Sequence, residues 1–468
     1  MENNFNVKKL FKFLYSVVIL IVLTLSYSYI WLHFYNRIIN PTVESTGVVF
    51  KNTGNWLIIA FYFGILALFS VVFGSLKIGY LKMSNVIYSQ MLTILCVNLI
   101  TYFQICLVTR MLVPATYILA LTAFDAFIVI VLVLIAQKLY SKLFPPRRLV
   151  IIYGSSLATE LVYKMSSRYD KYRICYSMNI SRGFEAIKEL IPSFDGVIIC
   201  DVESKIRNDI LKFCYEHSIR AYVTPKISDI IIRSADNIDL FDTPILLCRN
   251  TGLDVWEKTL KRFFDILLSL VALIVLSPFM LITALAIKIY DGGPVFFKQD
   301  RVTINGKIFK ILKFRSMIVD AEKDGKSIPA VDNDPRITPV GKIIRKTRLD
   351  ELPQIINILC GDMSIVGPRP ERPEHIEEYE KIIPEFRYRL KVKGGLTGYA
   401  QVFGKYNTSA YDKLRLDLMY IQNYSFILDV KLILATIKIL FLKESTEGFD
   451  KAVDLNNIKD PLEKKNKK

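Results

Sequence analysis

Four apolar stretches open the chain, and each is long enough to cross a membrane as a helix. They cover residues 11–35, 56–76, 86–108 and 112–137. A helix of about 20 apolar residues spans the roughly 30 Å of hydrocarbon in a bilayer and satisfies its own backbone polar groups there. We therefore predict a four-helix transmembrane bundle over residues 1–142. The first stretch is too long for a signal peptide, and no small-residue cleavage site follows it.

The charged residues between these stretches predict the orientation of the helices. Basic side chains crowd one set of helix ends: Lys8, Lys9, Lys77, Lys82, Lys138, Lys142, Arg147 and Arg148. The other ends carry Arg37, Lys51 and Arg110, with Glu44 between the first two. Because loops rich in lysine and arginine stay on the inner side, we expect the N-terminus and everything after the fourth helix to be cytoplasmic.

The composition of the chain indicates which partners and which cofactor to expect. Hydrophobic residues make up 52% of the 468 residues, and the net charge is +17. A basic, apolar chain is expected to meet anionic membrane lipids and phosphorylated substrates, and no nucleic acid. The seven cysteines form no CxxC pair, and three histidines are too few to favour a zinc site. A bound metal is therefore expected to be Mg²⁺, held by carboxylates and phosphates.

A small α/β module is predicted over residues 148–245. Apolar runs at 149–153, 196–201 and 221–225 predict buried strands, and a helix is expected over 205–217. Strands that alternate with helices are typical of a parallel sheet. The turn after the first strand has one glycine where a dinucleotide fingerprint has three, which favours a non-catalytic Rossmann-like module. Whether this module is regulatory or structural stays open.

A fifth apolar stretch, residues 263–287, differs from the first four because Ser277-Pro278 lies near its centre. A proline there removes a helix hydrogen bond and bends or breaks the helix. Both ends are basic, with Lys261 before it and Lys288 after it, which favours two cytoplasmic ends. We predict a re-entrant membrane hairpin over residues 261–288. The alternative, a kinked fifth transmembrane helix, would put the rest of the chain outside the cell.

The polar remainder, residues 289–445, contains the densest cluster of motifs. Basic residues lead into the pair Asp350-Glu351, an arrangement that suits phosphate chemistry because cations neutralise phosphoryl oxygens and a carboxylate can bind Mg²⁺ or attack phosphorus. A solvated helix start is the simpler interpretation of the pair.

Residues 427–443 are expected either on the membrane surface or in the core, and the lysine-rich residues 446–468 are expected to form a flexible tail.

Two further basic patches accompany the acidic pair. Arg387, Arg389, Lys391 and Lys393 alternate with apolar residues, which predicts a strand with four cations on one face. The glycines of residues 394–398 would let a ligand approach the backbone closely. The same face would also suit lipid headgroups.

A third patch, residues 299–316, contains Arg301, Lys313 and Arg315 in a probable strand–turn region. The chain has no Walker A loop, no GxSxG motif and no HExxH motif. ATPase, serine hydrolase and zincin classes are therefore unsupported.

Taken together, residues 261–443 resemble the bacterial sugar transferase family, the monotopic polyprenyl-phosphate phosphoglycosyl transferases. The motifs that carry the resemblance are Ser277-Pro278, Lys313-Phe314-Arg315-Ser316-Met317, Leu349-Asp350-Glu351-Leu352-Pro353-Gln354, Gly361-Asp362-Met363-Ser364, Gly367-Pro368-Arg369-Pro370 and Leu396-Thr397-Gly398. The leading helices and the Rossmann-like module make the whole chain similar to the long form of that family. The resemblance implies a mixed α/β catalytic domain over residues 289–445 on the cytoplasmic face of the bacterial inner membrane.

The resemblance also implies a reaction and roles for individual residues. Asp350 would attack the sugar-bearing phosphate of a UDP-sugar and release UMP, and undecaprenyl phosphate would take the phospho-sugar from the aspartyl intermediate. Glu351 would assist through the Mg²⁺ site or the carrier phosphate. Arg345 and Arg369 correspond to phosphate-binding arginines, a role that Lys313, Arg315 and Arg301 would share. The pathway would be the first membrane step of capsule, exopolysaccharide or O-antigen synthesis.

Two departures from the family pattern put the substrate preference in doubt. Gly394 stands where the family commonly has proline, and Lys405 stands where it commonly has arginine. The main rival hypothesis is a non-catalytic membrane scaffold whose module senses a nucleotide. The sequence does not identify the sugar, and the long-form resemblance alone suggests a homodimer through the membrane helices.

Overall fold

The structure is a computed structural model of the chain. It describes residues 2–36, 52–155, 157–240, 242–248, 252–319, 321, 334–404 and 408–440. The predicted tail, Lys405 and the loop residues Arg37, Glu44 and Lys51 lie outside these ranges. The chain divides into two compact units at Thr224/Pro225, inside the predicted module of residues 148–245. Each unit is described by itself.

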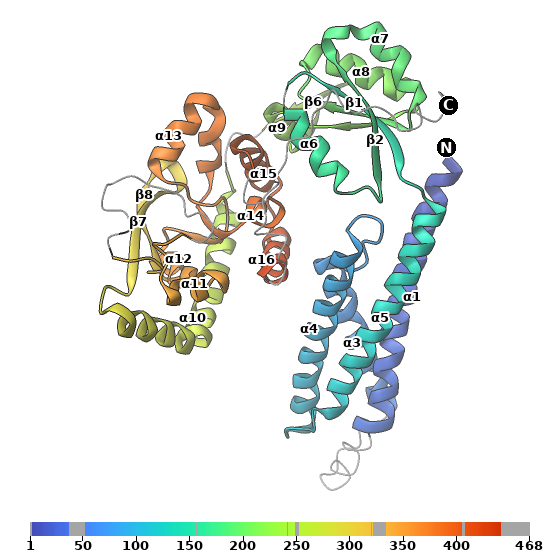
Figure 1. The fold of residues 1–468 in the computed structure, drawn as a ribbon. Helices are drawn as coiled ribbons and strands as arrows, with labels where there is room; N and C mark the ends of the chain where they lie inside the picture. Colours follow the sequence, from blue (N-terminus) through green and yellow to red (C-terminus); the bar gives the residue numbers. More distant parts are fainter. Residues whose placement is uncertain are drawn as a thin grey trace. The chain divides into compact units, whose positions relative to one another are not determined.

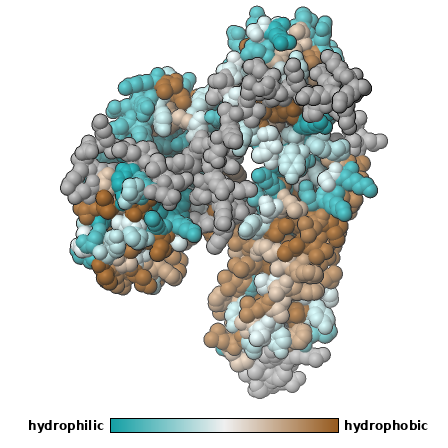
Figure 2. Space-filling model, in the orientation of Figure 1, coloured by the Kyte–Doolittle hydropathy of each residue, from teal (hydrophilic) through white to brown (hydrophobic). Residues whose placement is uncertain are grey.

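The first unit begins with long apolar helices that share one buried core. Their bounds are α1 Glu2–Ile30, continued by the π-helical turn η1 Trp31–Tyr35, α3 Asn52–Phe73, α4 Met83–Thr109 and α5 Thr116–Leu143. Only 22–33% of the residues in an 18-residue apolar window of each helix are buried, and many large apolar side chains on these helices are exposed. Figure 2 shows this apolar surface as a brown band along the helices. Helices of this kind are typical of a protein whose solvent is lipid, which confirms the prediction of a membrane protein with a helical N-terminal region.

A four-stranded parallel sheet in the order β2-β1-β3-β4 follows the helices. Its strands are β1 Arg147–Tyr153, β2 Tyr172–Asn179, β3 Gly196–Cys200 and β4 Arg220–Val223, and its helices are α6 Leu157–Ser166, α7 Phe184–Leu190 and α8 Ser204–Glu216. Hydrophobic clusters cover both faces of the sheet. The α/β architecture and three of its strands are thus as predicted, and β2 was not predicted.

The second unit starts with α9 Ile227–Arg233 and the hairpin of β5 Asp236–Leu240 and β6 Thr243–Leu247. Ile227 and Ile230 of α9 are buried in the same hydrophobic cluster as Leu414 and Leu418 of α15. Helix α9 therefore belongs structurally to the second unit, although it follows the sheet of the first unit directly in the sequence.

The fifth apolar stretch forms α10, Val255–Asp291, with Pro278 inside it. Near its start, the Asp265 carboxylate accepts hydrogen bonds from the Ser364 hydroxyl and the Ile365 backbone N–H. Near its end, Ile287 packs in a cluster with Phe314. A straight α-helix would separate positions this far apart by roughly 30 Å or more, at 1.5 Å per residue. Figure 1 shows why both ends reach one domain, because α10 is drawn as two arms that meet at a bend.

The middle of α10 stands away from that domain. Ile274 is 73% exposed and Phe279 is 55% exposed, although both are large and apolar. The Ser277 hydroxyl donates to the carbonyl of Ile274 inside the helix, 2.8 Å away. Both ends of α10 are thus held by the domain, whereas its apolar middle is not. A membrane hairpin is expected to have these features.

The domain that holds α10 is mixed α/β. Its strands and helices are β7 Phe296–Val302, β8 Ile308–Phe314, α11 Pro339–Lys346, the 3₁₀ turn η5 Leu349–Glu351, α12 Gln354–Cys360, β9 Ser364–Val366, α13 Pro373–Ile382, the 3₁₀ segment η6 Pro384–Lys391, β10 Gly395–Thr397, α14 Tyr399–Phe403, α15 Ala410–Gln422 and α16 Phe426–Leu440. Strands β7 and β8 form an antiparallel hairpin, which agrees with the predicted strand–turn region. Strands β9 and β10 are parallel neighbours.

Two details of this domain correct the predictions. Residues 387–391, predicted as a strand with cations on one face, belong to the 3₁₀ segment η6, and the cations do not share a face. Arg387 is paired with Glu380 at the surface, whereas Arg389 is buried against Asp417. The glycines after this segment serve backbone packing, because a Cβ on Gly395 would lie 2.1 Å from the Gly367 nitrogen.

Helix α16 packs partly in the core, one of the two environments predicted for it. Leu432 is 1% exposed and packs in the core of the second unit, whereas Ile427 is 65% exposed on the same helix. The buried Asp429 accepts a hydrogen bond from Lys261 of α10 at 2.6 Å and another from Tyr420 at 2.8 Å. This buried ion pair fixes the first arm of α10 to the domain.

Candidate active site

The two acidic residues that the sequence singled out lie on η5, the short 3₁₀ turn between α11 and α12. Arg348, the residue before it, has a left-handed backbone with φ of 60°, which ends α11 and turns the chain sharply. Leu349 and Leu352 flank the acids and pack against the cluster of Ile287 and Phe314. Apolar anchors on both sides therefore hold the acidic turn against the end of α10.

Glu351 is clamped by cations. Its Oε1 accepts hydrogen bonds from Lys313 Nζ at 3.0 Å and from Arg369 Nη2 at 2.8 Å, and its Oε2 lies 3.8 Å from Arg348 Nη1. Burial alone would raise the pKa of Glu351, but Arg369 and Lys313 outweigh it and hold this pKa well below its usual range. Glu351 is therefore ionised and its oxygens are already engaged.

Asp350 has the opposite character. Its Oδ1 is buried and has no hydrogen-bond partner among the described residues. Burial raises the pKa of this carboxyl, and the neighbouring Glu351 raises it further, while Lys313, Arg345 and Arg348 partly offset the rise. A desolvated carboxylate oxygen without a donor keeps its lone pairs available. Asp350 is thus the acid of the pair that can attack an electrophile or bind a cation.

The predicted cations fall into two groups. Lys313 and Arg369 meet at Glu351, and Arg345 on the last turn of α11 acts electrostatically on Asp350. Arg345 forms no ion pair with any residue that the structure describes, so its charge is available to a ligand.

The other two cations are held elsewhere. Arg315 is 6% exposed on its side chain and donates to Asp291 at 2.7 Å and to the Pro294 carbonyl at 2.7 Å. Arg301 donates to the Pro370 carbonyl at 3.2 Å. Arg315 therefore closes the end of α10, and Arg301 supports the turn that carries Arg369.

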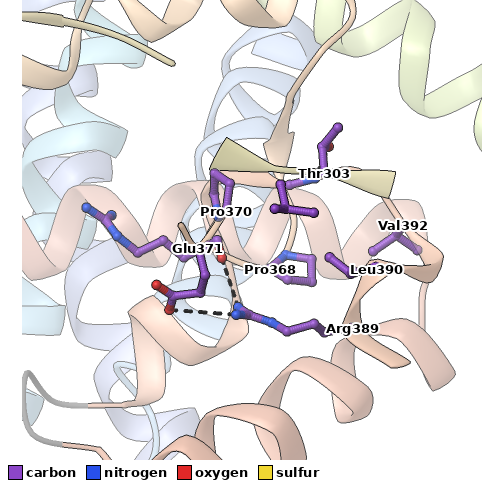
Figure 3. Close-up of a pocket in the computed structure, with 10 residues that line it drawn as sticks. Thr303, Pro368, Pro370, Glu371, Arg389, Leu390 and Val392 are labelled. Atoms are coloured by element: carbon purple, nitrogen blue, oxygen red, sulfur yellow. Dashed lines mark hydrogen bonds and ion pairs between the residues drawn. The ribbon is translucent and has the colours of Figure 1, made fainter. Parts of the chain in front are cut away.

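A buried ion pair that the sequence did not reveal supports the Pro-Arg-Pro turn that carries Arg369. Arg389 Nη2 lies 2.8 Å from Asp417 Oδ2, and the two side chains are 3% and 1% exposed. The same nitrogen donates to the Arg369 carbonyl at 2.9 Å. Figure 3 shows Arg389 reaching toward Glu371 and the backbone of the turn in a small pocket. Asp417 lies on the apolar face of α15, and that position was the one signal of its burial in the sequence.

The described residues contain no group of three or more His, Cys, Asp or Glu side chains that would hold a metal ion by themselves. Mg²⁺ is commonly bound by one or two carboxylates together with substrate phosphates and water. The unpartnered Oδ1 of Asp350 fits such a role. Glu351 fits it poorly, because both of its oxygens face cations.

Comparisons with known proteins point to this region. The model of the family described as bacterial sugar transferase matches residues 256–443. The chain is 43% identical over 213 residues to the UDP-glucose:undecaprenyl-phosphate glucose-1-phosphate transferase of Klebsiella pneumoniae, and the match covers 44% of each chain. It is 45% identical over 182 residues to the UDP-N-acetylgalactosamine-undecaprenyl-phosphate N-acetylgalactosaminephosphotransferase of Aeromonas hydrophila, over 38% of this chain and 43% of that one.

A shorter relative is matched over almost its whole length. The chain is 43% identical over 200 residues to the exopolysaccharide production protein PSS of Rhizobium leguminosarum bv. phaseoli, which covers 41% of this chain and 98% of that protein. The first two relatives are matched over less than half of their lengths. The similarity is thus concentrated in the second unit, where α10 and the acidic turn lie.

The buried network gives a prediction about stability. Asp417→Leu removes the nearer of the two carboxylates beside the buried Arg389 and leaves only Glu371, 3.6 Å away, so it should destabilise the protein by about 3 kcal/mol. Arg389→Met/Asp417→Leu removes both charges of the closer pair and should recover most of the loss. The measurement is the thermal unfolding midpoint of the detergent-solubilised chain. Glu380→Leu is the matched control, because it breaks an exposed ion pair and should cost no more than about 1 kcal/mol. Equal losses for Asp417→Leu and Glu380→Leu would contradict the assignment.

Proposed function

The chain belongs to the bacterial sugar transferase family, and from this premise we propose that it transfers a sugar-1-phosphate from a UDP-sugar to undecaprenyl phosphate. The products are undecaprenyl-diphosphate-sugar and UMP, and the reaction is the first membrane step of a surface polysaccharide. The observation that carries the proposal is the contrast between two adjacent acids. Glu351 is clamped by Lys313 and Arg369, while the buried Oδ1 of Asp350 has no partner among the described residues.

The chemistry proceeds in two displacements at one phosphorus atom. Asp350 attacks the sugar-bearing phosphorus, the bond from that phosphorus to the bridging oxygen breaks, and UMP leaves with the electron pair. An oxygen of undecaprenyl phosphate then attacks the aspartyl phospho-sugar, and the Asp350 carboxylate is released. Splitting the transfer through a covalent intermediate replaces one difficult step by two easier ones.

The cations around the turn have distinct tasks in this reaction. Arg345 is the available charge near Asp350 and is suited to bind the diphosphate of the donor. Lys313 and Arg369 hold Glu351 and keep a positive field at the carboxylate that reacts. Positioning and electrostatic stabilisation supply most of the catalysis in phosphoryl transfer. The site therefore has the parts that the reaction requires.

We further propose that Asp350, together with the phosphates of the donor, would hold Mg²⁺, which would supply positive charge for the phosphate chemistry. Glu351 stays with its cations and orients the turn. The donor sugar is left open, because the named relatives differ between glucose and N-acetylgalactosamine.

The bent α10 supports a re-entrant position in the cytoplasmic membrane. Its apolar middle would enter the bilayer from the cytoplasmic face, and both ends would return to the domain that holds them. Asp350 would then lie at the surface where nucleotide-sugars and the phosphate of the carrier lipid meet.

Asp350→Asn tests the nucleophile. In the absence of undecaprenyl phosphate, the wild-type chain should release about one equivalent of UMP and retain the phospho-sugar on a peptide that contains Asp350. Asp350→Asn should lower the release of UMP and the amount of phospho-sugar on this peptide by at least about a thousandfold, because an amide cannot form the intermediate. The assay uses UDP-glucose and UDP-N-acetylgalactosamine, with peptide mass analysis and Glu380→Gln as an unaffected control. Undiminished UMP release by Asp350→Asn would remove this residue from the chemistry.

Metal dependence tests the proposed Mg²⁺ contact separately from turnover. Mg²⁺ should tighten UDP binding by roughly tenfold or more, measured by calorimetry with the full chain, since a cation held at a carboxylate would attract the anionic diphosphate. Asp350→Asn should lose this tightening, whereas Glu351→Gln should retain it. The opposite pattern would assign the metal to Glu351.

Two native cysteines report the topology of α10. Cys248 precedes the helix, Cys360 follows it, and both are exposed. A re-entrant hairpin keeps both on the cytoplasmic side, so a membrane-impermeant maleimide should label neither in intact spheroplasts and both after permeabilisation. Peptide mass mapping identifies the labelled residue. Labelling of Cys360 alone from outside would establish a spanning helix and reject the re-entrant position.

A further inference from the structure

Five cationic side chains gather where the membrane helices of the first unit meet its α/β sheet. They are Lys8, Lys12, Arg147, Lys171 and Arg220. The first two lie one turn apart near the start of α1, and the other three lie at or beside the first residues of β1, β2 and β4. Parallel strands begin at one edge of a sheet, so this edge and the beginning of α1 face each other.

Aromatic rings hold the three lysines in place. Lys12 Nζ lies 3.5 Å and Lys171 Nζ 4.9 Å from the centroid of the Tyr80 ring. Lys8 Nζ lies 4.9 Å from the ring centroid of Phe144 and 5.2 Å from that of Tyr140. Side chains from two parts of the unit thus converge on one group of rings.

No carboxylate of the described residues forms an ion pair with this cluster. None of the five cations forms an ion pair within the part of the chain that the structure describes. Arg147 donates to the Tyr222 hydroxyl at 2.9 Å, and the nearby Asp170 is engaged by Arg168 at 2.9 Å. Burial lowers the pKa of Lys171, and Arg168 and Arg147 lower it further. Among the described residues, the cluster is therefore half-buried, crowded with like charge and not compensated by a carboxylate.

Ordinary flanking lysines of membrane helices behave differently. They extend their ammonium groups into water, where like charges are screened and hydrated. Lys138 and Lys142 near the end of α5 do so, since both are exposed. Like charges that converge under aromatic rings cost free energy unless an anion joins them. Basic pockets at the ends of apolar helices lie at the level of lipid phosphates.

We propose that Lys8, Lys12, Arg147, Lys171 and Arg220 form a binding site for a phosphate group, carried either by an anionic phospholipid or by a soluble phosphate compound. The site lies in the first unit and does not involve Asp350, so it stands or fails independently of the transferase proposal. An occupied site would cross-link the start of α1 to the sheet edge and fix the α/β module on the membrane helices.

Binding by the delipidated full chain in detergent tests the site. Short-chain phosphatidylglycerol, phosphatidylcholine and inorganic pyrophosphate are titrated, and affinity is read from tryptophan fluorescence or thermophoresis. The wild type should prefer phosphatidylglycerol to phosphatidylcholine by at least about tenfold, and Lys8→Gln/Lys12→Gln should weaken phosphatidylglycerol binding by roughly 10- to 30-fold. Lys138→Gln/Lys142→Gln removes the same charge at the same end of the helices and should weaken it by less than about threefold.

The probes separate the two sources of phosphate. Competition by pyrophosphate supports recognition of phosphate itself, whereas binding of phosphatidylglycerol without such competition assigns the site to lipid. Binding of pyrophosphate alone assigns it to a soluble compound. Failure of the wild type to bind either probe, or equal losses in the two double variants, would overturn the proposal.

A charge-preserving variant guards against misfolding. Lys8→Arg/Lys12→Arg keeps both charges and should bind phosphatidylglycerol within about threefold of the wild type. Because the glutamine variant relieves like-charge repulsion, its thermal midpoint in neutral detergent should equal or exceed that of the wild type. Loss of binding by a correctly folded arginine variant would contradict an electrostatic site.

Discussion

The carboxylate of Glu351, whose side chain is 13% exposed, joins three parts of the second unit that are far apart in the sequence. It joins the acidic turn to Lys313 of β8 at 3.0 Å and to Arg369 of the Pro-Arg-Pro turn at 2.8 Å. Removing one member of this set leaves the others without their partner, and the loss is smaller than for a fully buried pair because the Arg369 side chain is 43% exposed. Glu351 engages these cations, and the Oδ1 of the adjacent Asp350 has no hydrogen-bond partner among the described residues. The carboxylate proposed to react is thus left available by what its neighbour binds.

Ion pairs and hydrogen bonds also fix the position of α10 relative to the acidic turn. The Lys261–Asp429 pair and the Asp265 contacts hold the first arm of α10, while the Arg315–Asp291 pair closes the second. Leu349 and Leu352 beside the acidic turn pack against that second arm. In the proposed re-entrant position, the height of Asp350 above the membrane is therefore set by rigid contacts, which suits a reaction between a soluble donor and a membrane-bound acceptor.

Sequence patterns predicted the parts of this protein that follow from local periodicity. The long apolar helices and the buried strands β1 and β3 are continuous apolar runs, so they were predicted correctly. Strand β2, Tyr172–Asn179, was missed because polar residues interrupt its pattern at the edge of the sheet. Residues 387–391 alternate like a strand but form 3₁₀ turns, because Arg389 is drawn into the interior by Asp417 on α15. A partner 28 positions away leaves no trace in local periodicity.

The candidate site shows the same limit in a sharper form, because residue type alone does not tell a ligand-binding cation from a structural one. Arg315, Arg301 and Arg345 were predicted together as phosphate-binding residues. The structure pairs Arg315 with Asp291 and places Arg301 4.0 Å from Glu371, whereas Arg345 forms no ion pair among the described residues. The criterion that separates them is whether a buried or half-buried cation already has an anion. Among the described residues, that criterion applies to Arg345 beside Asp350 and, in the first unit, to the cluster around Lys8 and Lys12, for which we propose an external phosphate as the missing charge.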